Sequence, residues 1–458
     1  MANRKKIVLI GAGSAMFTQG LVADIILAGK NWDLRLVDID PKALETATGL
    51  ARRMVQAKNA DISIEASVDR RDMLPGADVV VTTIGVGGRR AWEADVFIPR
   101  KYGIFQPVGD TIMAGGISRA MRMIPAMVDI ANDVVQLAPK ALFFNYANPM
   151  TCNCWAVRKA TKANMVGLCI GTIHVVQELA DLVGAPRREV SALAAGINHF
   201  TWVYDLRWNG RDAWPLVRER LAAERAKGGL ELGRDFAPGG DSTMADRGWR
   251  HVAYNPFSWS LFDSFGAYPA VNDRHVVEFF PERFPQGKYY GHTLGVDIMV
   301  FEDTIAHGDK IYADMAAQAR GEMPLSQAIF DRALGEHSQL IDIIDGIEQD
   351  NRACFYANLP NQGAIPNLPG DAILEMTCVA TGKGLLPIQD SSYPDMLAAV
   401  QARKIAGEAI TVEAALTGSR TLFVEALLAD GCISDRVAAG KLADELITAQ
   451  REYLPQFA

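Results

Sequence analysis

The stretch that decides the fold lies near the N-terminus, where residues 6–14 spell KIVLIGAGS and residues 36–40 spell LVDID. Four apolar residues lead into a glycine turn, and the second apolar run is followed by Asp38. This order of strand, glycine turn, helix and acid is typical of dinucleotide binding, because glycines let the backbone approach a pyrophosphate and the acid binds a ribose hydroxyl. An acid at position 38, in place of a basic residue, favours NAD over NADP.

The motif departs from the usual glycine pattern in two ways. Met16 occupies the position of the third glycine, so the helix that follows must pack on the strand differently. Asp38 comes 27 positions after Gly11, where about 20 is usual. An ordinary strand–turn–helix unit is therefore the alternative interpretation of these residues.

The composition is that of an ordinary globular protein. Of the 458 residues, 49% are hydrophobic and 22% are charged, and the net charge is −8. The negative balance argues against nucleic acid or a membrane surface as the main partner. Apolar runs fall short of the ~18 residues of a membrane helix, and the first strand leaves no room for a signal peptide. Six cysteines make no disulfide framework in so long a chain, so we expect a reduced, cytoplasmic protein.

Apolar strands alternate with helical patterns through the first third of the chain. Continuous apolar runs separated by helices predict a parallel sheet covered on both faces, which is an α/β doubly wound fold of the Rossmann type. We assign residues 1–195 to this NAD-binding domain. After the Asp38 strand, the expected strands are residues 62–66, 77–84, 141–145 and 165–169.

The pattern changes beyond about residue 200. Residues 202–206 alternate like an antiparallel strand and lead to the turn Asn209-Gly210, while residues 218–227 form a charged helical pattern. Residues 290–350 and 400–450 are also helical in pattern. We therefore predict a C-terminal domain of mixed α+β structure over residues 196–458.

Ligands of a doubly wound sheet bind at the carboxyl ends of its strands. This rule places Gly85, Asn148 and Cys169 on one rim beside the glycine turn. Cys169 and His199 together offer a thiolate and an imidazole, which suits a first-row transition metal. A buried cysteine and a hydrogen-bonded structural histidine are the alternative interpretation.

Two further stretches carry polar residues of several kinds. The loop at residues 265–275 contains Tyr268, Asp273, Arg274 and His275 near a turn, which is typical of a functional site. Arg89 and Arg90 follow a glycine pair at an expected strand end, where they would bind an anionic group of a substrate. A polar turn and solvated arginines are the simpler alternatives.

Together these stretches resemble glycoside hydrolase family 4, the NAD-dependent glycosidases, over essentially the whole chain. The resemblance implies a nucleotide-binding domain related to the lactate and malate dehydrogenases, a small-molecule glycoside as substrate, and a homodimer or homotetramer. The motifs that carry it are GAGS (11–14), QPVGDT (106–111), NYANP (145–149), GLC (167–169), GINH (196–199), YPAVNDRH (268–275) and NLPNQG (358–363).

The resemblance also implies a redox mechanism. NAD+ takes a hydride from C3 of the sugar, which acidifies the proton on C2, and Tyr268 removes that proton. A divalent metal on Cys169 and His199, usually Mn2+, holds the sugar oxygens O2 and O3. The leaving group departs from C1, water adds there, and the hydride returns, so NAD+ is not consumed.

The resemblance and the motifs assign roles to individual positions. The implied catalytic residues are Tyr268, Asn148, Asp110 and His174. The implied cofactor-binding residues are Gly11, Gly13, Ser14, Ala15, Met16, Phe17, Asp38, Gly85, Asn145 and Asn148. The implied substrate-binding residues are Arg89, Arg90, Asn148, His199 and Arg274.

One position departs from the family pattern. The residue after the metal cysteine is Ile170, which cannot protonate a leaving group. Either His174 supplies the proton, or the leaving group needs no strong acid. The GDT stretch at residues 109–111 looks like the branch that acts on unphosphorylated sugars, where Arg89 or Arg90 would serve a carboxylate or sulfonate at C6.

Two other functions remain as alternatives. A simple NAD-dependent dehydrogenase of a sugar or 2-hydroxy acid would also carry an Asn-Pro pair such as Asn148-Pro149 after a strand. The chain lacks the Gly-His-Gly catalytic loop of such enzymes, which argues against that function. A nucleotide-sensing protein without catalysis is disfavoured by the polar residues around Tyr268.

Overall fold

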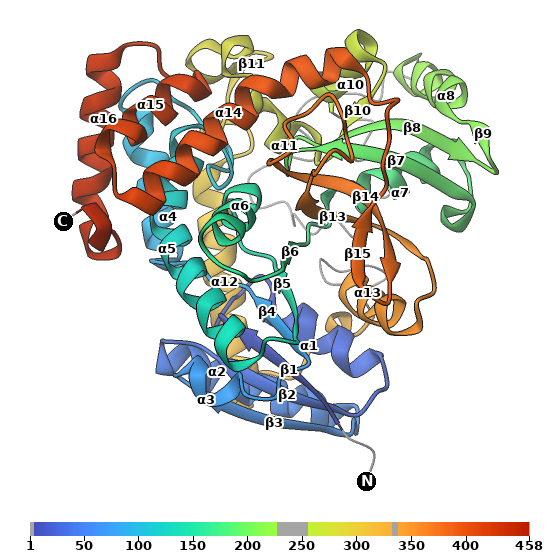
Figure 1. The fold of residues 1–458 in the computed structure, drawn as a ribbon, viewed down its shortest axis with the longest axis vertical. Coiled ribbons are helices and arrows are strands. Elements are labelled where there is room, and N and C mark those ends of the chain that lie inside the picture. Colours follow the sequence, from blue (N-terminus) through green and yellow to red (C-terminus); the bar gives the residue numbers. More distant parts are fainter. Residues whose placement is uncertain (1–3, 227–254, 332–337, 458) are drawn as a thin grey trace.

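The computed structural model describes residues 4–226, 255–331 and 338–457. Its main feature is one 13-stranded sheet that runs from the N-terminal half into the C-terminal half (Figure 1). Eleven of these strands follow the order β10-β8-β7-β14-β13-β6-β5-β4-β1-β2-β3, while β15 pairs with β14 and β9 pairs with β8.

The N-terminal half of the sheet is parallel. Its order β3-β2-β1-β4-β5-β6 is that of a dinucleotide-binding fold, and the order reverses between β1 and β4. Ile10 at the end of β1 pairs with both Val37 and Thr82, so the neighbouring strands end at the same level. The prediction of a doubly wound sheet is confirmed. The strands are β1 (Lys5–Ile10), β2 (Trp32–Val37), β3 (Ile62–Ser67), β4 (Val79–Thr82), β5 (Leu142–Asn145) and β6 (Met165–Gly167).

Helices cover both faces of this parallel half. Asp40 caps α2 by accepting a hydrogen bond from the backbone N–H of Lys42, and a proline follows at the first helical position. The helices are α1 (Thr18–Leu27), α2 (Pro41–Ala57), α3 (Arg70–Met73), α4 (Gly88–Arg100), α5 (Met113–Leu137), α6 (Met150–Ala160) and α7 (Gly171–Val183).

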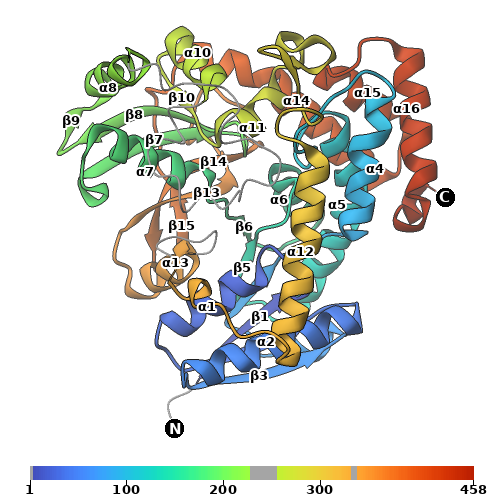
Figure 2. The same cartoon turned by 180° about the vertical axis from the view of Figure 1, so that it is seen from behind.

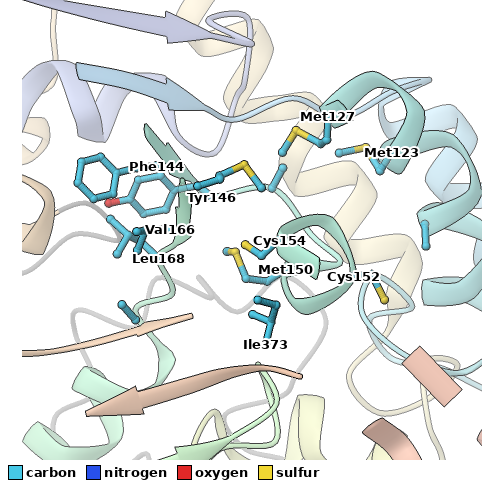
Figure 3. Packing of buried hydrophobic residues seen from close by; sticks show 14 of the residues in the cluster. Met123, Met127, Phe144, Tyr146, Met150, Cys152, Cys154, Val166, Leu168 and Ile373 are labelled. Atoms are coloured by element: carbon cyan, nitrogen blue, oxygen red, sulfur yellow. The ribbon is translucent and has the colours of Figure 1, made fainter. Parts of the chain in front are cut away.

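The core beneath the rim is packed with sulfur-containing side chains (Figure 3). Met150 and Cys154 of α6 lie against Gly167 of β6, where an added Cβ would come within 2.5 Å of the methionine sulfur. Cys152 and Cys154 are both buried, as packing residues would be. A glycine at position 167 therefore lets α6 approach the sheet closely enough to bring Asn148 to the rim.

The C-terminal half of the sheet is antiparallel, which the sequence indicated only for the region of β8. β13 joins the two halves through the pairing of Asn358 with Gly167. β7 spans the predicted domain boundary at residue 195 and pairs with β8 and β14, so it belongs to the antiparallel half. These strands are β7 (Val190–Gly196), β8 (Trp202–Trp208), β9 (Arg211–Asp212), β10 (Tyr268–Pro269), β13 (Cys354–Pro360), β14 (Ile373–Thr381) and β15 (Gly384–Pro387).

The remaining helices wrap both halves. Figure 2 shows α12 lying along the side of the molecule next to α2, and α14 returns to pack on α5 and α6. The last residue of the charged pattern at 218–227, Lys227, lies outside the described residues. The helices are α8 (Trp214–Ala226), α10 (Pro256–Phe265), α11 (Asn272–Val276), α12 (Phe301–Arg320), α13 (Ser338–Gln349), α14 (Asp395–Thr417), α15 (Arg420–Asp430) and α16 (Arg436–Ala449).

Short elements complete the chain, including a two-stranded sheet of β11 (Lys288–Tyr289) and β12 (His292–Thr293). They occupy much of residues 277–293. The helical region predicted to start at residue 290 therefore begins only with α12 at Phe301. Within the described ranges, none of the helices combines the length and apolar character that a bilayer crossing requires.

Candidate active site

The glycine turn that was predicted to bind a nucleotide lies at the end of β1. The backbone N–H of Gly13 donates to the Asp38 carboxylate at 2.8 Å, and burial raises the pKa of that carboxyl. Gly11 has φ +93°, and an added Cβ would lie 2.8 Å from the backbone of Ile84. A side chain at position 11 would therefore collide with the loop after β4.

The missing third glycine has a structural reason. Residues 15–17 form a turn, and α1 begins only at Thr18, whose hydroxyl donates to the Ala12 carbonyl at 2.6 Å. Met16 lies in this longer turn with an exposed side chain, so close helix–strand packing is not required of it. The Phe17 ring lies 5.7 Å from the ring of Tyr146 on the neighbouring loop.

Asn145 and Asn148 have different surroundings on the rim. The amide of Asn145 is buried and bonds to Thr82 and to both backbone groups of Ala147, so it shapes the loop after β5. The Asn148 side chain instead donates to Asp110 at 2.9 Å. Arg119 of α5 donates to the Asn148 carbonyl at 3.0 Å. Asn148 is therefore the asparagine of this pair that lies beside the polar centre.

Three side chains with metal-binding atoms meet at this centre. Asp110, His199 and His275 each offer one ligand atom within 4.8 Å of the other two. The centroids of the two imidazole rings are 4.1 Å apart. One oxygen and two nitrogens form a donor set that suits a divalent first-row metal such as Mn2+.

Hydrogen bonds set the proton positions in this group. Burial alone would raise the pKa of Asp110, but His199, His275 and Arg119 outweigh that effect and bring the pKa to about 2. The ionised carboxylate accepts the Thr111 hydroxyl proton at 2.7 Å, so His199 Nδ1 must donate to the same hydroxyl, also at 2.7 Å. Nε2 of His199 is then the nitrogen with a free lone pair, as a metal ligand requires.

Burial favours the neutral form of both histidines. Burial lowers the pKa of His199, and burial together with His199 lowers the pKa of His275 well below its usual value. Neutral imidazoles are the ligating form. The backbone of His199 is left-handed (φ +63°), a conformation that non-glycine residues adopt at a cost and that is concentrated in functional sites.

Two buried acids support the loops that carry these ligands. Glu278 accepts from the backbone N–H groups of Val108 and Gly109 at 2.8 and 2.9 Å, and burial raises its pKa to about 8. Asp273 accepts from Ser258 at the start of α10 and from the hydroxyl of Tyr289. These contacts fix the loop before Asp110 and the short helix that carries His275.

Cys169 lies at the predicted strand end but is not a member of the Asp110–His199–His275 group identified among the described residues. Its sulfur accepts from the backbone N–H of Gly171 at 3.3 Å. Val271 packs on Gly171, where an added Cβ would lie 1.9 Å from the valine methyl, so the Cys169 turn and the 268–275 loop are neighbours. His174 lies half-buried in the first turn of α7. The roles of Cys169 and His174 stay predictions.

Tyr268 is fully buried in β10, where its hydroxyl donates to Asn272 at 2.8 Å. Burial raises the pKa of Tyr268 well above its usual value, and the charges of Asp273 and Glu178 raise it further. This environment favours the phenol over the phenolate that a proton-abstracting tyrosine needs. The role of Tyr268 as the C2 base therefore stays a prediction that its surroundings do not favour.

Arg89 and Arg90 lie on α4 and share one partner outside the rim. Both guanidinium groups pair with Asp309 of α12, at 2.5 and 2.6 Å. The Arg89 side chain also lies against Gly308 and over the ring of Tyr312. Their contacts join α4 to α12, and the assignment to a substrate anion stays a prediction. Arg274 instead lies near Asp110, beside His275.

Several residues of the site were not assigned a role from the sequence. His275 stood in the polar loop without one, although its neighbour Arg274 was predicted to bind substrate. Thr111 acts through its contact with His199, which is 88 positions away in the sequence. Glu278 acts through its contact with the loop before Asp110, which is about 170 positions away. Arg119 lies inside a long helix, where no local pattern distinguishes it from a solvated arginine.

The fold and the site together define a class of protein: an enzyme with a dinucleotide-binding sheet and a polar, metal-capable centre at its rim. The model of the family 4 glycosyl hydrolases matches residues 6–185, and the model of their C-terminal domain matches residues 194–433. The chain belongs to family 4 of the glycosyl hydrolases, which confirms the resemblance found in its motifs.

Relatives align over nearly the whole chain. An α-galactosidase of Rhizobium meliloti is 30% identical, covering 99% of this chain and 90% of its own. An α-galacturonidase of Bacillus subtilis is 28% identical, covering 96% of each. A crystal structure of a 6-phospho-α-glucosidase from gut microorganisms, in complex with NAD and Mn2+, has a TM-score of 0.83 at 17% identity and covers 99% of this chain and 100% of its own. That similarity confirms the fold.

Proposed function

We propose that this protein is an NAD-dependent, metal-assisted glycosidase of unphosphorylated glycosides. The observation that carries the proposal is the position of the Asp110–His199–His275 group, which Asn148 links by a hydrogen bond to the loop after β5. A sugar between this group and the glycine turn would meet both a metal and a nicotinamide. A reduced, cytoplasmic location fits the six cysteines, none of which is joined in a disulfide within the described residues.

The nucleotide site fits NAD. Gly11 and Gly13 allow close approach of a pyrophosphate, and the Asp38 carboxylate follows β2 at the position that binds a ribose hydroxyl. When bound, NAD+ supplies a hydride acceptor at the sugar. The loop after β4 and the turn before α1 both lie next to the glycine turn, and we propose that both contact the cofactor.

The metal would be held by His199 through Nε2, by His275 and by Asp110. A divalent cation supplies charge that stabilises negative charge on sugar oxygens. Thr111 fixes the tautomer of His199, and Asn148 orients the Asp110 carboxylate. Cys169, the ligand implied by the resemblance, lies on the adjoining turn and is a competing candidate.

The proposed substrates are only a part of those that the family as a whole cleaves. The two relatives described above carry the names α-galactosidase and α-galacturonidase, which both denote unphosphorylated glycones. A C6-acidic glycone, either a uronate or a sulfonate, is the finer proposal. For the leaving group, His174 stays a candidate acid, because Ile170 has no proton to give.

A panel of nitrophenyl α-glycosides tests the proposal. It should include galactoside, glucoside, galacturonide, glucuronide and sulfoquinovoside, each with both NAD+ and Mn2+, with one of them, and with neither. We expect cleavage of at least one glycoside only when both are present. A purified enzyme that cleaves equally well after removal of NAD+ would contradict the proposal, and so would one that only oxidises free sugars.

A further inference from the structure

Two arginines beside the Asp110 group have no acidic partner of their own. Arg119 of α5 and Arg274 of α11 are half-buried, and the charge of Asp110 acts on the pKa of both. Neither arginine forms an ion pair with any residue that the structure describes, whereas Arg122 one turn along α5 pairs with the buried Asp95.

The hydrogen bonds of these arginines leave donors unused. Arg274 donates one N–H to Thr304 at 2.6 Å, and its buried Nε has no partner in the described parts of the chain. Arg119 donates Nε to the Asn148 carbonyl at 3.0 Å. Its Nη2 lies close to Gly85, 3.8 Å from where a Cβ would stand, so this end of the guanidinium faces the rim at β4.

The local charge balance is positive. Asp110 is one carboxylate between two guanidinium groups. Of the other acids that act on these arginines, Asp95 is paired with Arg122, and Glu278 is bound to backbone N–H groups. Burial raises the pKa of Glu278 to about 8, so this acid is largely neutral near pH 7. A buried guanidinium without a countercharge is costly, and an anionic ligand removes that cost.

We infer that Arg119 and Arg274 bind the acidic group of the substrate, a carboxylate or sulfonate carried by the glycone. This inference rests on the proposed glycosidase function and deepens it. Asn148, which the resemblance places at the sugar, donates to Asp110 through its side chain and accepts from Arg119 through its carbonyl. Arg89 and Arg90, the earlier candidates, are both paired with Asp309.

The test measures selectivity between matched substrates. Arg119→Met and Arg274→Met are compared with the parent enzyme on α-galacturonide and α-galactoside, at saturating NAD+ and Mn2+. A charge-assisted pair contributes about 1.5 to 3 kcal/mol, so we expect kcat/KM for the acidic glycoside to fall about 10- to 100-fold. The ratio of kcat/KM for the acidic glycoside to kcat/KM for the neutral glycoside should fall by the same factor, because the neutral glycoside lacks the acid. Arg187→Met, which removes an exposed partner of Asp181, is the matched control.

A second measurement separates the substrate anion from the pyrophosphate of NAD. NAD+ affinity, measured by calorimetry on each variant, should stay within about twofold of the parent value. A large loss of NAD+ affinity with equal losses on both glycosides would overturn the inference and assign the arginines to the cofactor. Selectivity that disappears in Arg89→Met or Arg90→Met, but not in the Arg119 and Arg274 variants, would also overturn it.

Binding of free sugars keeps the inference testable if no glycoside is cleaved. The parent protein should bind galacturonate at least about tenfold more tightly than galactose in calorimetry, and Arg119→Lys and Arg274→Lys should retain part of that preference. Equal binding of the two sugars would contradict the inference alone. Absence of cleavage across the whole glycoside panel, with this preference present, would instead contradict the proposed function.

Discussion

At the scale of single residues, the site depends on side chains that act through one another. Thr111 bonds to Asp110 and to His199, and this pair of bonds determines which imidazole nitrogen is free. The sequence places Thr111 in a recognisable motif. The hydrogen bond by which Thr111 fixes the His199 tautomer depends, however, on contact with a residue 88 positions away.

Thr111→Val should weaken Mn2+ binding by about 10- to 100-fold, because the His199 tautomer loses its partner. Electron paramagnetic resonance of Mn2+ titrated into the protein reports this without requiring catalysis. Thr111→Ser, which keeps the hydroxyl, is the control and should bind Mn2+ almost as the parent does. Unchanged affinity in the valine variant would remove Thr111 from the metal site.

Cys169→Ser and His275→Ala distinguish the two candidate ligand sets in the same experiment. We expect a large loss of Mn2+ affinity in His275→Ala and a small one in Cys169→Ser. The reason is that Cys169 is not part of the Asp110–His199–His275 group, whose ligand atoms lie within 4.8 Å of one another. In the Co2+-loaded protein, a thiolate ligand produces a charge-transfer absorption. Its presence in the parent and its loss in Cys169→Ser would favour the cysteine instead.

Glu278 should make stability depend on pH. Its pKa is about 8 in the folded chain and about 4.3 in an unfolded one. Between these values the unfolded chain loses a proton that the folded chain keeps, so the free energy of unfolding falls as pH rises, by up to ~1.4 kcal/mol per pH unit. Glu278→Gln should flatten that slope in urea denaturation between about pH 5 and pH 8. An equal slope in parent and variant would contradict this assignment.

At the scale of elements, the sequence predicted the parallel strands well and the antiparallel ones poorly. β1 to β6 are mainly apolar runs separated by helices, so their sequence pattern alone predicts a parallel sheet. β13 and β14 follow helix α13 without a comparable alternation, and their pairing with β6 and β7 depends on distant parts of the chain. The NDRH stretch was recognised as polar, but no local pattern indicates that its His275 lies beside Asp110.

Gly13 tests the nucleotide-binding element. An added Cβ would lie 2.5 Å from the Cβ of Ala43 and 2.8 Å from the Asp38 carboxylate, so Gly13→Ala should push α2 and Asp38 away. We expect NAD+ affinity, measured by calorimetry, to fall at least about tenfold. Gly370→Ala is the matched control, because nothing lies within 4 Å of its added Cβ. Equal NAD+ affinity in both variants would contradict the assigned role of this turn.

At the scale of the whole molecule, buried polar contacts join the first and last parts of the chain. Arg122 of α5 pairs with Asp95 of α4, and both contact Gln450, which directly follows α16. The side chains of Arg122 and Asp95 are fully buried. The homodimer or homotetramer implied by the resemblance stays a prediction.

Arg122→Met should lower the free energy of unfolding by about 3 to 5 kcal/mol, because it leaves the Asp95 charge buried and unpaired. The double variant with Asp95→Leu should recover much of that loss. Thermal or urea denaturation of the three proteins measures the difference. An Arg122→Met variant as stable as the parent would show that the pair does not hold α4 and α5 against the segment that follows α16.

The central claim is that NAD+ acts as a catalyst in glycoside cleavage and is not consumed. The most direct measurement follows product release and absorbance of NADH in one reaction that contains far less NAD+ than glycoside. The account predicts many molecules of glycoside cleaved per NAD+ with no net accumulation of NADH. One NADH formed for each molecule of sugar converted, with the reaction stopping when NAD+ is exhausted, would contradict it and identify a simple dehydrogenase.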